Sequence, residues 1–212
     1  KGAVSDMRRW SVGPTWLLML ALTVALCGRA QSQELEELQA STLQKYQDVI
    51  AKGQVPQDLQ ALHAQLFDRT TAVRIMAVQS LALVGGPMGA LLLVKAMDAS
   101  QEREPAVRLA AAEGLGDIGG RQALEVLGLG ITDRDPAVRM RVVQSLRWAG
   151  TVFAVPYIQE AIRRDRDVNI RLEAVRMLRK IGTQFSVEPL VEAVMTDRDL
   201  GIKLAAADAL GE

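Results

Sequence analysis

The stretch ITDRDPAVRMRVVQSLRWAG, residues 131–150, contains a pattern that returns at nearly equal intervals along the chain. A valine or isoleucine followed by a basic residue marks the same point in five places, and we take the basic residue as the origin of each unit. These origins are Arg74, Arg108, Arg139, Arg171 and Lys203. The steps between them are 34, 31, 32 and 32 residues. A nearly constant period of this length is the sequence signature of a repeat architecture.

Each unit carries apolar residues at the same offsets from its origin. Valine or isoleucine stands at −1, alanine or valine at +3, leucine at +7, and a further apolar residue at +10 in the first four units. In the unit around Arg139 these residues are Val138, Val142, Leu146 and Ala149. Because a helix has 3.6 residues per turn, the four offsets lie on one face, and the pattern predicts an amphipathic helix in every unit.

Polar and small residues mark both ends of this helix. Four residues before the origins stand residues that mostly favour an N-terminal cap, namely Thr70, Glu104, Asp135, Asp167 and Asp199. Eleven residues after the origins stand glycines that suit a C-terminal cap, namely Gly85, Gly119, Gly150 and Gly182. Before each N-cap lies a second apolar segment, at residues 57–67, 87–97, 121–131, 154–163 and 186–195. Each unit is therefore expected to fold as two helices.

A pair of helices in about 32 residues is too small to bury its own apolar surface, so neighbouring units have to stack. The composition, 49% hydrophobic but only 4% aromatic, also favours closely packed helices over sheets. The sequence thus predicts an all-α fold, an α-solenoid of about five two-helix repeats over residues 57–212. Residues 31–56 are expected to cap the first repeat as a helix, with a flexible linker as the alternative. The last unit stops before its +10 residue, which indicates either a frayed helix or a longer array.

An acid stands six residues before each origin, in the turn between the two helices. The origin residue lies in the first helical turn, where the helix dipole disfavours a cation, and a guanidinium can hold two acceptors at once. We therefore predict a ladder of ion pairs, within a repeat or between neighbouring repeats. Its members are Asp68, Arg74, Glu102, Arg108, Asp133, Arg139, Asp165, Arg171, Asp197 and Lys203.

The recurring order D-x-D-P-x-V-R-x-x-A-x-x-x-L-x-x-x-G, seen at residues 133–150 and 165–182, resembles bacterial HEAT-like repeats of the short phycobilin-lyase type. The resemblance covers about residues 57–212. It implies stacked helical pairs that serve as a scaffold or interaction module, because only a minority of this family are enzymes. A chromophore lyase or isomerase of the same family is the alternative function.

Residues 7–30 have the features of a secretory signal peptide, and residues 1–6 are expected to lie upstream of its natural start. Met7-Arg8-Arg9 gives a positive start, WLLMLALTVAL (16–26) is an apolar run, and Gly28-Arg29-Ala30 has the pattern of a cleavage site. A membrane span needs about 20 apolar residues, more than this run supplies. We therefore expect export to the periplasm or cell envelope, with membrane attachment only through an uncleaved leader or a lipidated Cys27.

Cleavage after Ala30 would remove four basic residues, one acidic residue and Cys27, the only cysteine. The remaining chain would hold 21 basic and 24 acidic residues. Disulfides are thereby excluded, and the mildly acidic balance argues against a nucleic-acid partner.

The sequence offers little chemistry for catalysis. His63 is the only histidine and is expected to pack among the leucines of its helix. One histidine without cysteine cannot build a zinc site, and neither a G-x-x-x-x-G-K nor a G-x-S-x-G motif is present. The paired acids recur with the repeat, as capping groups would. We expect no enzymatic activity, no metal and no cofactor.

The second helix of each unit is the candidate surface for a protein partner. Offsets +5 and +8 lie opposite the buried face and are expected to form a ridge, while the apolar offset +1 is expected mainly to pack between repeats. From Arg139 to Lys180 there are ten basic and four acidic residues, which predicts a positive patch for an acidic protein segment or anionic lipid head groups. A solvated surface without a partner is the alternative. The candidate partner-binding residues are Arg141, Gln144, Arg147, Trp148, Arg176, Arg179 and Lys180.

Overall fold

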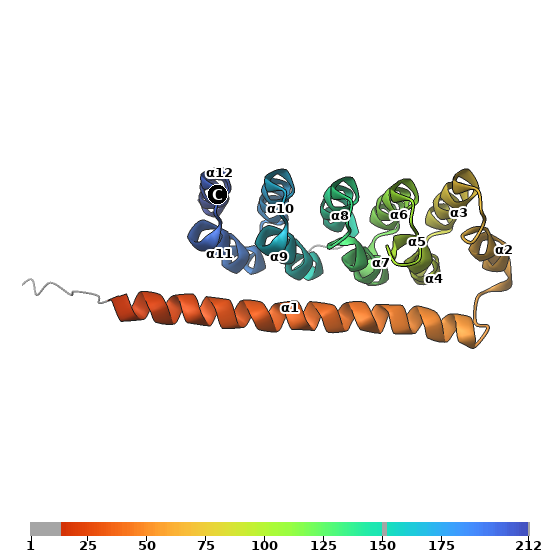
Figure 1. The fold of residues 1–212 in the computed structure, drawn as a ribbon, viewed down its shortest axis with the longest axis horizontal. Coiled ribbons are helices and arrows are strands. Elements are labelled where there is room, and N and C mark those ends of the chain that lie inside the picture. The colour runs from red at the N-terminus through yellow and green to blue at the C-terminus, as the bar shows by residue number, and fades with distance from the viewer. Residues whose placement is uncertain (1–13, 150–151, 212) are drawn as a thin grey trace, which may run out of the picture.

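A computed structural model of the chain describes residues 14–149 and 152–211, with side chains for all of these except 14–29, 31 and 147–149. One long helix, α1 (Pro14–Ala51), precedes a row of stacked helical pairs (Figure 1). The described residues contain no strand. The predicted all-α solenoid of about five two-helix repeats is confirmed.

The helices of each repeat follow the predicted order. Repeat 1 consists of α2 (Gln57–Gln65) and α3 (Thr71–Val84). Repeat 2 consists of α4 (Gly86–Leu92), α5 (Val94–Met97) and α6 (Pro105–Ile118). Repeat 3 consists of α7 (Gly120–Leu127), the 3₁₀ turn η1 (Gly128–Gly130) and α8 (Pro136–Ala149). Repeat 4 consists of η2 (Val152–Ala154), α9 (Val155–Arg164) and α10 (Val168–Ile181), and repeat 5 of η3 (Gln184–Ser186), α11 (Val187–Thr196) and α12 (Leu200–Leu210).

The core is continuous from repeat to repeat. It contains the offsets −1, +3 and +7 except at the two ends of the array, where Val73 is only partly buried and Leu210 is 37% exposed. In α6 these residues are Val107, Ala111 and Leu115, all fully buried. Burying one such leucine contributes about 1.5–3 kcal/mol. The +10 position lies at the edge of the core, because Ile118 is only partly buried and Val84 is 55% exposed.

The predicted glycines lie at C-terminal helix ends, and two of the predicted acids form hydrogen bonds at N-terminal ends. Gly85, Gly119 and Gly182 end their helices with φ of 70°, 65° and 58°, a region that strains any residue with a Cβ. Gly150 lies outside the described residues. The carboxylates of the N-caps Asp167 and Asp199 accept hydrogen bonds from backbone N–H groups of their helices at 2.8 and 3.2 Å.

The offset +1 residues are the apolar side chains that we expect mainly to pack between repeats. These side chains are partly buried wherever another repeat follows, and Leu204 of repeat 5 is 58% exposed. The partly buried members are Ile75, Leu109, Met140 and Leu172.

Helix α1 runs along the first helices of the repeats, on the side opposite the second helices (Figure 1). It contacts α5, α7, η1 and α9, so it covers repeats 2 to 4. It also reaches repeat 1, the repeat that it is expected to cap, through Tyr46 and His63. It passes without a break through Ala30, the expected cleavage position. Met7 to Arg9, the basic start of the expected leader, lie outside the described residues. Among the described helices, none combines the length and the apolar character needed to cross a membrane.

Candidate functional site

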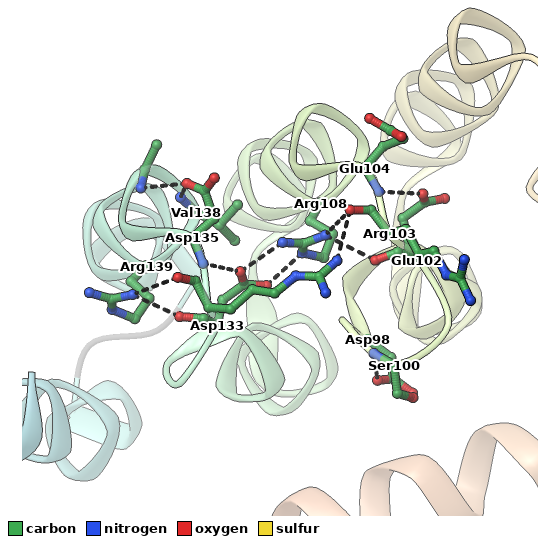
Figure 2. Close-up of polar contacts among 12 residues, drawn as sticks. Asp98, Ser100, Glu102, Arg103, Glu104, Arg108, Asp133, Asp135, Val138 and Arg139 are labelled. Atoms are coloured by element: carbon green, nitrogen blue, oxygen red, sulfur yellow. Dashed lines mark hydrogen bonds and ion pairs between the residues drawn. The ribbon is translucent and has the colours of Figure 1, made fainter.

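The turns between the helices carry a ladder of arginine–carboxylate pairs that joins each repeat to the next. Figure 2 shows one of these pairs, Arg108 with Asp133. Arg108 donates through Nε and Nη2 to the two carboxylate oxygens of Asp133 in the following repeat, at 2.6 and 2.9 Å. Its Nη1 donates to the backbone carbonyl of Glu102 in its own turn, at 2.9 Å. The same arrangement is present in Arg74–Glu102, Arg139–Asp165 and Arg171–Asp197.

Each carboxylate of the ladder also accepts a hydrogen bond from a backbone N–H of its own turn. Asp133 accepts a hydrogen bond from the backbone N–H of Asp135 at 2.8 Å, which fixes the turn that starts the second helix. Within the described residues, the first and last members of the ladder, Asp68 and Lys203, make contacts of a different kind, with backbone groups only. Asp68 accepts from the N–H of Thr70 at 2.7 Å, and Lys203 donates to the carbonyl of Met195 at 3.4 Å.

Burial and charge are consistent with the structural role that we predict for the ladder. Both side chains of the Arg108–Asp133 pair are fully buried, and the hydrogen bond to Asp133 raises the pKa of the Arg108 guanidinium above its ordinary value although burial opposes this. Burial favours the neutral form of Glu102, but hydrogen bonds from Arg74 and a backbone N–H outweigh it, so the pKa of Glu102 lies below its ordinary value. Groups held in this charged state are poor proton donors or acceptors for catalysis.

On the second helices, offset +5 is mostly exposed, whereas offset +8 is exposed at Arg179 but not at Ala82 or Gly116. Gln79 and Glu113 at +5 are exposed. Gly116 at +8 is buried, and a Cβ built on it would lie 3.0 Å from the side chain of Ser145 in the next repeat. The prediction that offset +8 forms part of an open ridge is therefore wrong for this repeat, because that position faces the +6 residue of its neighbour.

The candidate partner-binding residues divide into three groups. Arg176, Arg179 and Lys180 on α10 are all exposed, and their spacing of three and four residues places them on one helical face. Arg176, whose side chain is 59% exposed, lies 3.5 Å from Glu173 of the same helix. Arg141 and Gln144 on α8 are partly buried. The side chains of Arg147 and Trp148 lie outside the described residues.

The opposite side of the array, formed by the first helices, is covered by α1. Leu35, Thr42 and Tyr46 are buried, and their spacing of seven and four residues gives α1 one inward face. The sequence contained this signal, but we interpreted the segment only as a cap or a linker.

Polar contacts fix α1 on this side at three points. Ser32 donates to Glu160 of α9 at 3.0 Å, and Lys45 donates to Glu125 of α7 at 2.8 Å. Gln39 donates to the backbone carbonyl of Gly128 at 2.6 Å. The first-helix side is thus an interface within the chain, whereas α10 presents its cations on the other side.

His63 joins α1 to repeat 1. Tyr46 Oη lies 3.1 Å from His63 Nε2, and the Phe67 ring packs edge-on against the imidazole at 5.3 Å between centroids. Burial, together with Lys95, lowers the pKa of His63 below its ordinary value. Within the described part of the chain, no group of three or more histidine, cysteine or acidic residues is placed to hold a metal ion.

Comparison with known proteins agrees with this architecture. The family model of HEAT repeats matches residues 59–147, 98–167 and 155–212. The match is to the repeat family as a whole and does not single out the phycobilin-lyase type. No curated protein matches the chain. HEAT-repeat proteins are typically non-enzymatic scaffolds for protein interaction. With matches that together extend over residues 59–212, the chain belongs to the HEAT-repeat family.

Proposed function

We propose that this protein is an exported, non-enzymatic scaffold that holds a protein partner on its second-helix face. The observation that carries the proposal is the position of α1, which occupies the first-helix side. Within residues 14–149 and 152–211, no other element covers the second helices. On that uncovered face, α10 presents Arg176, Arg179 and Lys180.

The chemistry of α10 favours an acidic protein segment. Three exposed cations on one helical face create a local positive potential in a chain whose formal net charge is zero. Such a patch steers an acidic partner to the surface and sets its orientation, and its effect weakens as salt screens it.

A charge-reversal series tests the surface. The full chain, the variant Arg176→Glu/Arg179→Glu/Lys180→Glu and a control variant are each used to capture proteins from an envelope extract. The control, Arg69→Glu/Arg166→Glu/Arg198→Glu, reverses three exposed arginines in the turns between helices. Each captured protein is identified, and its affinity is measured at two salt concentrations after circular dichroism shows that helicity is unchanged.

We expect a partner that binds the wild type and the control equally and the α10 variant at least ten-fold more weakly, with a smaller salt dependence in that variant. Equal binding by all three proteins would place the partner on another surface. Absence of any captured protein would leave the α10 cations as a solvated face and overturn the proposal.

Export has its own test. After expression of the full chain in its native host, we expect the protein in the envelope fraction with Gln31 as its first residue. All the polar contacts of α1 described above begin at Ser32, so cleavage after Ala30 would preserve them. An intact leader on cytoplasmic protein would contradict export.

A further inference from the structure

A pocket of about 390 Å³ lies between repeats 3 and 4, beside the Arg139–Asp165 pair of the ladder. The turn and α8 of repeat 3 form one side, and α9 with the turn that follows it forms the other. Ile131 and Ala161 supply apolar surface, while four arginines and three carboxylates supply the charged groups. The volume falls within the range of ligand-binding pockets, about 300–1,000 Å³.

Each of the three carboxylates is already paired with an arginine. The pairs are Asp133–Arg108, Asp165–Arg139 and Glu160–Arg164, with N–O distances of 2.6, 2.7 and 2.8 Å. Arg139 and Arg164, two of the four arginines of the lining, are therefore compensated within the protein. Glu36 of α1 lies 3.8 Å from Arg164 as well, but its side chain is 71% exposed and outside the lining. Together these pairs add no net charge to the pocket.

The other two arginines, Arg134 and Arg166, have no carboxylate partner among the described residues. Both are exposed, and each directly follows the ladder acid of its turn. Nη2 of Arg134 donates to the backbone carbonyl of Arg103 at 2.9 Å, which positions this guanidinium without neutralising its charge. One of the two arginines stands on each side of the pocket, so the lining carries two uncompensated positive charges.

Two further acids, Asp135 and Asp167, follow these arginines in the chain but do not line the pocket. The carboxylate of each accepts the N–H of the residue two positions later, at 2.8 Å. These carboxylates therefore face the N-termini of α8 and α10, as Figure 2 shows for Asp135, and the helix dipole offsets part of their charge. The pocket between Arg134 and Arg166 thus favours an anion.

We propose that this pocket binds a phosphate monoester. The phosphate group lies between Arg134 and Arg166, and the exposed hydroxyl of Thr132 in the lining donates a further hydrogen bond. A phosphate monoester carries a charge of about −1.5 to −2 at pH 7, which matches the two positive charges, and each guanidinium can hold two of its oxygens. The pocket is larger than a phosphate group alone, so the rest of the ligand covers Ile131 and Ala161. The site uses none of the α10 cations and does not depend on the function proposed above.

NMR of the arginine side chains tests the site directly. The full chain, labelled with nitrogen-15 arginine, is titrated with methyl phosphate and in parallel with methyl sulfate, which has the same shape but only one negative charge. We expect saturable shifts of the Nε signals of Arg134 and Arg166, none at Arg69, and at least five-fold weaker binding of methyl sulfate. Binding of methyl phosphate should also weaken below about pH 6, where the phosphate takes up a proton. No saturable shift, or equal affinity for the two esters, would overturn the proposal.

Glutamine substitutions separate this pocket from the other exposed arginines of the turns. Arg134→Gln/Arg166→Gln should weaken methyl phosphate binding at least ten-fold, with unchanged helicity by circular dichroism. The matched control is Arg69→Gln/Arg103→Gln, which changes the equivalent exposed arginines of repeats 1 and 2 outside the lining and should retain the affinity. Arg166→Gln alone leaves the contact of Arg134 with the Arg103 carbonyl in place and should still weaken binding at least three-fold. Unchanged affinity in both Arg166 variants, or the same loss in the control, would contradict the site.

Two larger esters distinguish the source of the phosphate. Glycerol phosphate carries it on a small molecule, and the peptide Ac-Ala-pSer-Ala-NH₂ carries it on a protein segment. Tighter binding of glycerol phosphate would assign the site to a small molecule, and tighter binding of the peptide to a phosphorylated protein. Either result supports a phosphate monoester site, whereas binding of neither ester would overturn it.

Discussion

Replacing Asp133 with asparagine should lower the free energy of unfolding by about 3–5 kcal/mol. Arg108 and Asp133 are both fully buried, and two N–H groups of the guanidinium hold the carboxylate at 2.6 and 2.9 Å. Asparagine retains the shape of the side chain but removes its negative charge, so Arg108 keeps a buried positive charge without its counter-ion. Removal of one partner from such a pair costs far more than the about 0–1 kcal/mol that an exposed ion pair contributes.

A double-mutant cycle with Arg108→Met shows whether the loss comes from the pair. The variant Arg108→Met/Asp133→Asn carries neither charge of this pair, so its loss should be smaller than the sum of the two single losses by about 2 kcal/mol or more. Urea unfolding followed by far-ultraviolet circular dichroism measures all four proteins. A loss below about 1 kcal/mol for Asp133→Asn, or strictly additive single losses, would refute the reasoning.

Three further outcomes follow from the packing, the pKa values and the exposure of single side chains. Gly128→Ala places a Cβ 2.3 Å from Tyr157 Cε1, so the ring must move and urea unfolding should show a loss of about 1–3 kcal/mol; an unchanged midpoint would mean that the contact relaxes freely. Folding lowers the pKa of Glu102 and Asp197, so the stability they add is present above their ordinary values of 4.5 and 3.8 and is lost as pH falls through the lowered values. Urea midpoints measured from neutral to acidic pH should therefore fall in the acid range, and a flat profile would contradict the ladder. Lys45→Ala should cost only about 0–1 kcal/mol because this side chain is 47% exposed, and amide exchange in α1 should stay nearly unchanged; rapid exchange along α1 would show that its docking depends on this one contact.

Local patterns were sufficient to predict the repeats. The offsets −1, +3 and +7 follow from helical geometry alone, and the glycines after each helix mark its end. The sequence did not decide whether each ladder arginine binds an acceptor in its own repeat or in the next one. The structure uses both, because Nη1 of Arg108 reaches the carbonyl of Glu102 in its own turn while the other donors reach Asp133 one repeat further on.

The course of α1 could not be predicted in the same way. Its contacts join residues far apart in the chain, such as Ser32 with Glu160, and few of its apolar side chains are fully buried. A pocket of about 430 Å³ between α1 and the first helices of repeats 3 to 5 also depends on this course, since Leu35 supplies part of its wall. Phe153 and Phe185 line that pocket and stand at the same offset before Arg171 and Lys203. Repeat 3 has Arg121 at the equivalent position, so the sequence did not mark the two phenylalanines as a repeated feature.

The attachment of α1 has a mechanical consequence for the array. Ser32 and Lys45 lie in one continuous helix, and the rise of the helix between them fixes about 20 Å between their contact points on α9 and α7. A solenoid bends by changing the spacing of its repeats. On this side the spacing is fixed by α1, because a continuous helix resists both stretching and compression along its axis. Helix α1 therefore limits the bending of the array. Any molecule that docks on the second helices meets a surface whose curvature is already set, so binding there does not have to straighten or close the array.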